Sequence, residues 1–114
     1  MSDPSPRSGG GRLVALSGDF KGMVYELTAD ETIIGRNPTT DITLLDDGIS
    51  REHAIISYEE TAGEKGEYVV EDLQSTNGTK LNGKRVRSAT LSPGDEIRIG
   101  STSFRFDLEP PSSS

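Results

Sequence analysis

The stretch DEIRIGSTSFRF, residues 95–106, decides the fold that the sequence predicts. Ile97 and Ile99 alternate with polar residues, and Phe104 and Phe106 do the same after a Gly-Ser-Thr segment. Successive side chains of a β-strand point to opposite faces, so this period of two indicates a hairpin with one apolar face. We therefore expect two antiparallel strands here, joined by a tight turn at residues 100–102.

The same pattern recurs outward along the chain. Short runs rich in β-branched and aromatic residues occur at 13–16, 23–27, 32–34, 54–58 and 68–73, and each is predicted to be a strand. Asn82-Gly83 is the preferred pair for a two-residue type I′ hairpin turn, and Pro93-Gly94 marks another turn. No segment of ten or more residues carries an amphipathic helix pattern. The sequence therefore predicts an all-β fold, an antiparallel β-sandwich or barrel of about ten short strands.

Composition predicts where the ordered part begins and ends. The 114 residues suffice for one domain with a small core. We expect residues 1–12 to be a disordered arm or linker, residues 13–108 to be the domain, and residues 109–114 to be a disordered tail, because both ends are rich in Ser, Pro and Gly. Such ends are also typical of linkers to further domains of a longer protein. Without an apolar leader or a long apolar run, we expect a cytoplasmic protein with no membrane partner.

Composition also excludes several functions. The chain has no Cys and one His, which argues against a metal centre and against most nucleophile–base pairs. Its net charge of −7 disfavours binding to nucleic acid or anionic membranes. The adjacent acidic pairs at 46–47, 59–60 and 71–72 would point to opposite sides of a strand, so they do not predict paired catalytic carboxylates. We expect no enzyme, no cofactor and no metal.

Three polar segments carry the chemistry that the sequence does offer. They are Gly35-Arg36, Ser50-Arg51-Glu52-His53, and DLQSTNGT at residues 72–79. Their guanidinium forks, hydroxyls and amide suit an anionic group, and the neighbouring glycines let backbone N–H groups approach it. A basic stretch follows at residues 80–87, and we interpret its cations as solvated charges of an edge strand, namely Lys80, Lys84, Arg85 and Arg87.

These segments resemble the forkhead-associated (FHA) domain family in order and spacing, and the likeness covers residues 13–108. The matching motifs are Gly35-Arg36, Ser50-x-x-His53, Ser75-Thr76-Asn77-Gly78-Thr79 and Asn82-Gly83. The resemblance implies an eleven-strand β-sandwich whose end loops bind phosphothreonine peptides in Ser/Thr-kinase signalling.

The resemblance also implies a role for each matching residue. Arg36 and Ser50 would contact the phosphate, Arg51 would add charge, Thr76 would help to hold the phosphate or the threonine methyl group, and Asn77 would bind the peptide backbone. Gly35, His53, Gly78 and Asn82 would support the loops and turns. The segment at 46–49, with Gly48 and Ile49, would select the residue three after the phosphothreonine. Its acids suggest tolerance of a basic residue there.

Two other functions remain open on the sequence. The first is a phosphate-independent interaction or oligomerisation module of the same fold that uses an exposed sheet face. The second is a hydrolase that depends on a carboxylate or on His53, for which no set of residues is apparent.

Overall fold

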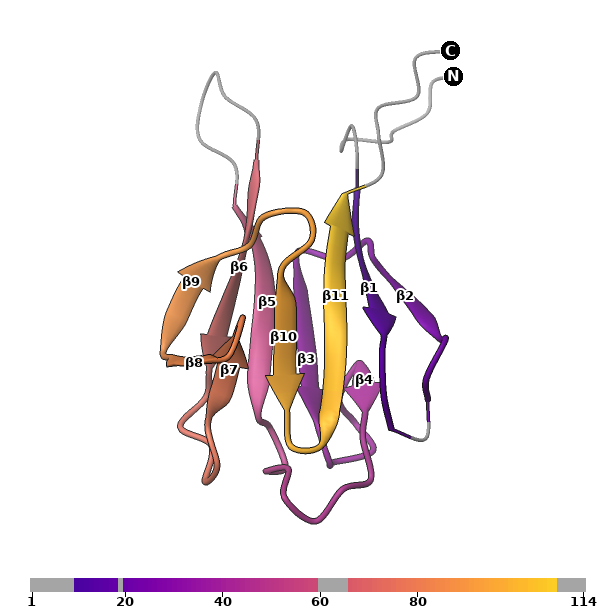
Figure 1. Ribbon diagram of the computed structural model, residues 1–114, viewed down its shortest axis with the longest axis vertical. Helices are drawn as coiled ribbons and strands as arrows, with labels where there is room; N and C mark the ends of the chain where they lie inside the picture. Colours follow the sequence, from indigo (N-terminus) through magenta and orange to yellow (C-terminus); the bar gives the residue numbers. More distant parts are fainter. Residues whose placement is uncertain (1–9, 19, 60–65, 109–114) are drawn as a thin grey trace.

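The computed structural model describes residues 10–18, 20–59 and 66–108, and within them it contains eleven strands and no helix (Figure 1). A six-stranded sheet has the order β2-β1-β11-β10-β7-β8, and a five-stranded sheet has the order β4-β3-β5-β6-β9. The first contains β1 (Gly11–Ala15), β2 (Val24–Leu27), β7 (Thr79–Leu81), β8 (Lys84–Val86), β10 (Glu96–Ile99) and β11 (Thr102–Leu108). The second contains β3 (Glu31–Gly35), β4 (Ile42–Thr43), β5 (Ala54–Glu59), β6 (Glu67–Asp72) and β9 (Ser88–Thr90). The predicted all-β sandwich is confirmed. No helix in the described ranges is long and apolar enough to cross a membrane.

The β10–β11 hairpin forms the centre of the core. Ile97 lies opposite Phe104, and both side chains have an exposed fraction of 0%. The ring of Phe106 packs 5.4 Å from that of Tyr68 on the other sheet. Burying one such side chain contributes roughly 1.5–3 kcal/mol, so the four buried apolar residues of this hairpin each stabilise the fold.

The first strand begins earlier than the sequence predicts. Gly11 and Arg12, expected in the disordered arm, are the first two residues of β1. The Gly11 amide donates to the Tyr68 hydroxyl at 2.9 Å, and a Cβ at Gly11 would lie 2.9 Å from the rings of Tyr68 and Phe106. Gly11 is therefore a core contact that its Ser/Pro/Gly surroundings concealed. The rest of the expected arm and the expected tail, residues 1–9 and 109–114, lie outside the described residues.

One pairing departs from the expected antiparallel arrangement. β3 and β4 run parallel, with Ile34 opposite Ile42 and Gly35 opposite Thr43. The connection at 36–41 turns back across the end of the sheet, and the Thr40 hydroxyl closes it by donating to the Asn37 carbonyl at 2.7 Å. Because β4 has only two residues and follows a polar loop, the sequence shows no alternating pattern that would predict it.

The turns predicted at Asn82-Gly83 and at Pro93-Gly94 are both present. Asn82 and Gly83 have φ values of 52° and 87°, as a type I′ turn between β7 and β8 requires. At the second turn Gly94 has φ 92° and the Asp95 amide donates to the Ser92 carbonyl at 3.0 Å, which is type II geometry. The Asn82 side chain joins the two turns, because its Nδ2 donates to Asp95 Oδ1 at 3.0 Å, and its Oδ1 accepts from the Glu96 amide at 2.9 Å.

Candidate functional site

The connections after β3, β4, β6 and β10 lie together at one end of the sandwich, the lower end in Figure 1. They contain all of the predicted site residues except Gly35, which is the last residue of β3, and Asn82. Asn82 lies at the far end of β7, where it bonds to Asp95 and Glu96. The structure therefore brings Asn82 to a turn remote from the end loops.

Gly35 lets two of these connections come into direct contact. The amide of Arg36 donates to the Ser50 carbonyl at 3.0 Å, and the amide of Asn37 donates to the Arg51 carbonyl at 3.2 Å. A Cβ at Gly35 would overlap the Arg51 carbonyl group, so only glycine fits this approach. The contact places the side chains of Arg36 and Arg51 at one pocket of about 330 Å³, which they line with Asn37 and Pro38.

The two arginines of this pocket are unpaired. Both are exposed, and neither guanidinium forms an ion pair or hydrogen bond with any residue that the structure describes. Two adjacent cations repel each other unless an anion lies between them. The pocket can therefore accept a multiply charged anion through planar N–H forks.

His53 lies between the loops and is completely buried. The Ser50 amide donates to its Nδ1 at 3.2 Å, so Nδ1 carries no proton. The proton is then on Nε2, which donates to the Gly78 carbonyl at 2.8 Å. The backbone of His53 also bonds to β3 and to the 73–78 loop, through Ile34 and Leu73. One imidazole ring thus joins the loop that carries Ser50 to the loop that carries Thr76 and Asn77.

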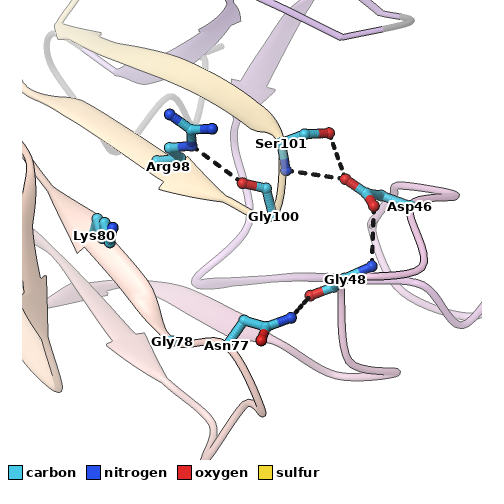
Figure 2. Close-up of a pocket in the computed structure, with 8 residues that line it drawn as sticks. All are labelled: Asp46, Gly48, Asn77, Gly78, Lys80, Arg98, Gly100 and Ser101. Carbon is cyan, nitrogen blue, oxygen red and sulfur yellow. Dashed lines mark hydrogen bonds between the residues drawn. The ribbon is translucent and has the colours of Figure 1, made fainter.

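The hydroxyl of Ser50 lies at the junction of the same two loops. Its Oγ accepts a hydrogen bond from the Thr76 amide at 3.1 Å. Since this bond uses only a lone pair, the Ser50 O–H remains available to donate to an incoming anion. Next to it, Asn77 Nδ2 donates to the Gly48 carbonyl at 2.8 Å, leaving its Oδ1 and a second N–H available (Figure 2).

Asp72 organises the 73–78 loop, and sequence reasoning assigned it no role. Its Oδ1 accepts from the hydroxyls of Ser75, at 2.5 Å, and Thr79, at 2.8 Å, and its Oδ2 accepts from the Ser75 amide at 3.0 Å. Ser75 Oγ in turn accepts from the Gly78 amide at 2.8 Å. Burial opposes ionisation of Asp72, but these hydrogen bonds outweigh it and lower the pKa below its ordinary value.

Asp46 has the same function in the loop after β4, and the sequence did not predict this structural role. Its Oδ1 accepts from the Gly48 amide at 3.0 Å, and its Oδ2 accepts from the amide of Ser101 at 2.9 Å and from the Ser101 hydroxyl (Figure 2). The bonds from Ser101 and Gly48 lower the pKa of Asp46 to about 2. The available sequence signal is an Asp two residues before a Gly or three before a Ser, as in turns closed by an Asp side chain.

The glycines and Ile49 complete the packing of this end. Gly78 has φ 84° and lies beneath the Arg85 side chain, which a Cβ would displace. Ile49 is 2% exposed and packs against Gly100 in the β10–β11 turn. Ile49 is therefore a core residue, while its neighbour Gly48 faces a groove with Asn77.

The sequence profile of the FHA domain matches residues 32–100. The chain belongs to the FHA domain family. The glycogen accumulation regulator GarA of Mycolicibacterium smegmatis is 40% identical to this FHA domain over 105 residues, which covers 92% of this chain and 63% of GarA.

Solved FHA structures agree with this membership. Mycobacterium tuberculosis EmbR, in complex with a low-affinity phosphopeptide, aligns with a TM-score of 0.79 and 32% identity over 99% of this chain and 28% of the EmbR chain. A structure from an analysis of phosphothreonine-dependent FHA domain interactions aligns with a TM-score of 0.75 and 32% identity, covering 89% of this chain and 98% of the other. The chain therefore spans less than two thirds of GarA and under a third of EmbR.

Proposed function

We propose that this FHA domain binds threonine-phosphorylated proteins through Arg36, Ser50, Arg51, Thr76 and Asn77, as a non-enzymatic module of Ser/Thr-kinase signalling in the cytoplasm. The observation that carries the proposal is the pocket of two guanidinium groups, Arg36 and Arg51, that pair with none of the described residues, on a chain whose net charge is −7. The phosphopeptide bound to EmbR and the phosphothreonine-dependent interactions studied in a second relative support it.

The charge of the ligand fits this pocket. A phosphothreonine carries about −1.5 to −2 charges at pH 7, which matches two guanidinium groups. The acidic body of the protein repels other polyanions, while the pocket attracts a localised dianion. The proposed contacts are hydrogen bonds and charge–charge interactions, so binding of the phosphopeptide needs no catalytic step.

The remaining residues suit a phosphorylated peptide rather than free phosphate. The Ser50 hydroxyl can donate to a phosphate oxygen while its lone pair holds Thr76. Asn77 has an oxygen and an N–H available, which is the complement of a peptide backbone. Three or four charge-assisted bonds of roughly 1.5–3 kcal/mol each, less the cost of ordering a peptide, give a dissociation constant of about micromolar.

Matched peptides with and without the phosphate on one threonine test the proposal by calorimetry. We expect phosphate-dependent binding that Arg36→Ala abolishes, because losing this partner costs roughly 2–5 kcal/mol. Lys84→Ala, on the edge strand β8, is the control and should bind as the wild type does.

Equal binding of both peptides would reject the proposal and favour a phosphate-independent interaction module of the same fold. Met23 and Val24, each 49% exposed at the edge strand β2, are the apolar residues that such a surface would use. Arg36→Ala would leave that interaction unchanged.

A further inference from the structure

A second groove lies beside Asn77, on the side of the six-stranded sheet (Figure 2). It has a volume of about 430 Å³, and its walls include Asp46, Gly48, Asn77, Lys80, Arg98 and Ser101. Lys80 and Arg98 come from the neighbouring strands β7 and β10, and the 46–48 segment lies opposite them in Figure 2.

The cations of this groove belong to a row across three strands. Arg98 of β10 is the register partner of Lys80 of β7, and Lys80 is the partner of Arg85 on β8. Like charges directly opposite each other on a sheet are destabilising. All three side chains are exposed, and none forms an ion pair with a residue in the described part of the chain. No ion pair in that part of the molecule offsets this repulsion.

Protection of a sheet edge does not explain these charges. The sequence suggested that Lys80 belongs to a set of solvated edge charges, but β7 and β10 are interior strands and only β8 forms this edge. Lys84 and Arg85 are therefore sufficient for the edge, whereas Lys80 and Arg98 need another explanation.

The acid of the groove is already engaged. Both oxygens of Asp46 accept hydrogen bonds, from Gly48 and from Ser101. In contrast, Arg98 makes one bond, from Nε to the Gly100 carbonyl at 3.2 Å, and Lys80 makes none to a described residue. Asp46 keeps its negative charge, but both of its oxygens are occupied, so the donors left for a ligand are those of the cations Lys80 and Arg98. From the acids of segment 46–49 alone, the sequence suggested instead that a basic residue is tolerated three after the phosphothreonine.

We propose that Lys80 and Arg98 bind the carboxylate of an Asp or Glu that flanks the phosphothreonine in the partner's chain. The proposal rests on the proposed function, because Asn77 lines this groove and also belongs to the phosphothreonine site. An extended peptide spans about 3.3 Å per residue, so a side chain a few residues from the phosphothreonine can reach the neighbouring groove. Two exposed ion pairs of this kind strengthen binding by about 2- to 20-fold in total.

A glutamate scan of one phosphopeptide tests this. A single Glu replaces Ala at each position from three before to four after the phosphothreonine, and binding is measured to the wild type and to Lys80→Ser/Arg98→Ser. Lys84→Ser/Arg87→Ser removes the same charge from outside the groove and is the control.

We expect one or two Glu positions to strengthen binding to the wild type and to the control by about 2- to 20-fold. The Lys80→Ser/Arg98→Ser variant should lose this preference, while its affinity for the all-Ala phosphopeptide changes less than about twofold. A preference that persists in this variant, or none in the wild type, overturns the inference alone. The same peptides are also measured without the phosphate. If they bind as tightly as the phosphopeptides, the proposed function is overturned as well.

Discussion

The Nε2 atom of His53 lies 2.8 Å from the carbonyl oxygen of Gly78, a residue 25 positions further along the chain. Together with the bond from the Ser50 amide to Nδ1, this contact fixes two loops against each other through one buried ring. The positions of Ser50 and Asn77 therefore depend on a side chain that itself lies away from solvent.

His53→Ala should destabilise the fold and weaken phosphopeptide binding together. The substitution leaves a cavity and removes the partners of a half-buried amide and a buried carbonyl, at a cost of about 3 kcal/mol in the free energy of unfolding. Urea denaturation followed by circular dichroism measures the stability, and calorimetry measures the binding. An unchanged unfolding midpoint would show that the ring is not a brace; Lys84→Ala is the reference with no expected change.

Gly35→Ala should be far more harmful than its small size suggests. The added methyl group would overlap the Arg51 carbonyl, and the backbone there has no flexible side chain that could give way. We expect a loss of about 2–4 kcal/mol in stability, as is found for overpacked or strained core positions. Gly10→Ala is the matched control, because no atom lies within 4 Å of a Cβ at that position. Thermal unfolding of the two variants should differ clearly; equal midpoints would contradict the close contact.

Acid should destabilise the domain through Asp46 and Asp72. Both carboxyls have a pKa below their ordinary value of 3.8, Asp46 at about 2. A lowered folded-state pKa contributes stability that is fully present above pH 3.8 and is lost as the pH falls toward the folded-state value. The free energy of unfolding should therefore be level from pH 7 to about 5 and decline from about 4.5 to 2.

Asp46→Asn isolates one part of this decline. The variant should lose about 1 kcal/mol at pH 7, because solvent screens an accessible carboxylate, and it should be less sensitive to acid than the wild type. Chemical denaturation at a series of pH values gives both quantities. A variant whose stability falls with pH as steeply as that of the wild type would remove Asp46 from this account.

The parts of the fold that could be predicted are those that short patterns of neighbouring residues specify. Ile97, Ile99, Phe104 and Phe106 alternate, so their hairpin and its buried face were visible, and Asn82-Gly83 specified its turn. What could not be predicted depends on contacts between distant segments. Asp46 bonds to Ser101 across 55 positions, and the Gly11 amide bonds to the Tyr68 hydroxyl across 57. Neither partner carries a local signal of the other.

The candidate site divides in the same way. Motif spacing identified the residues at the loops. Lys80, however, was predicted to be a charge of an edge strand, because no local pattern shows the order of the strands in a sheet. Only the register of β7 against β10 places Lys80 beside Arg98. The acidic preference that we propose for that groove therefore rests on this register.

Asn77 offers a sharp test of how loop order and peptide binding are connected. Its Nδ2 holds the Gly48 carbonyl at 2.8 Å, and its remaining amide atoms are proposed to bind the peptide backbone. Asn77→Ala removes both functions and should weaken phosphopeptide binding by about 10- to 100-fold, equal to one or two hydrogen bonds, while the exposed position keeps the stability change below about 1 kcal/mol.

Asn77→Asp keeps the shape but sets a carboxylate oxygen against the Gly48 carbonyl and places a negative charge beside the phosphate. It should therefore bind still more weakly than Asn77→Ala, and the difference should shrink in 0.5 M salt. Calorimetry of both variants with one phosphopeptide, at low and high salt, provides the comparison; if Asn77→Asp binds as well as the wild type, Asn77 does not face the phosphorylated ligand.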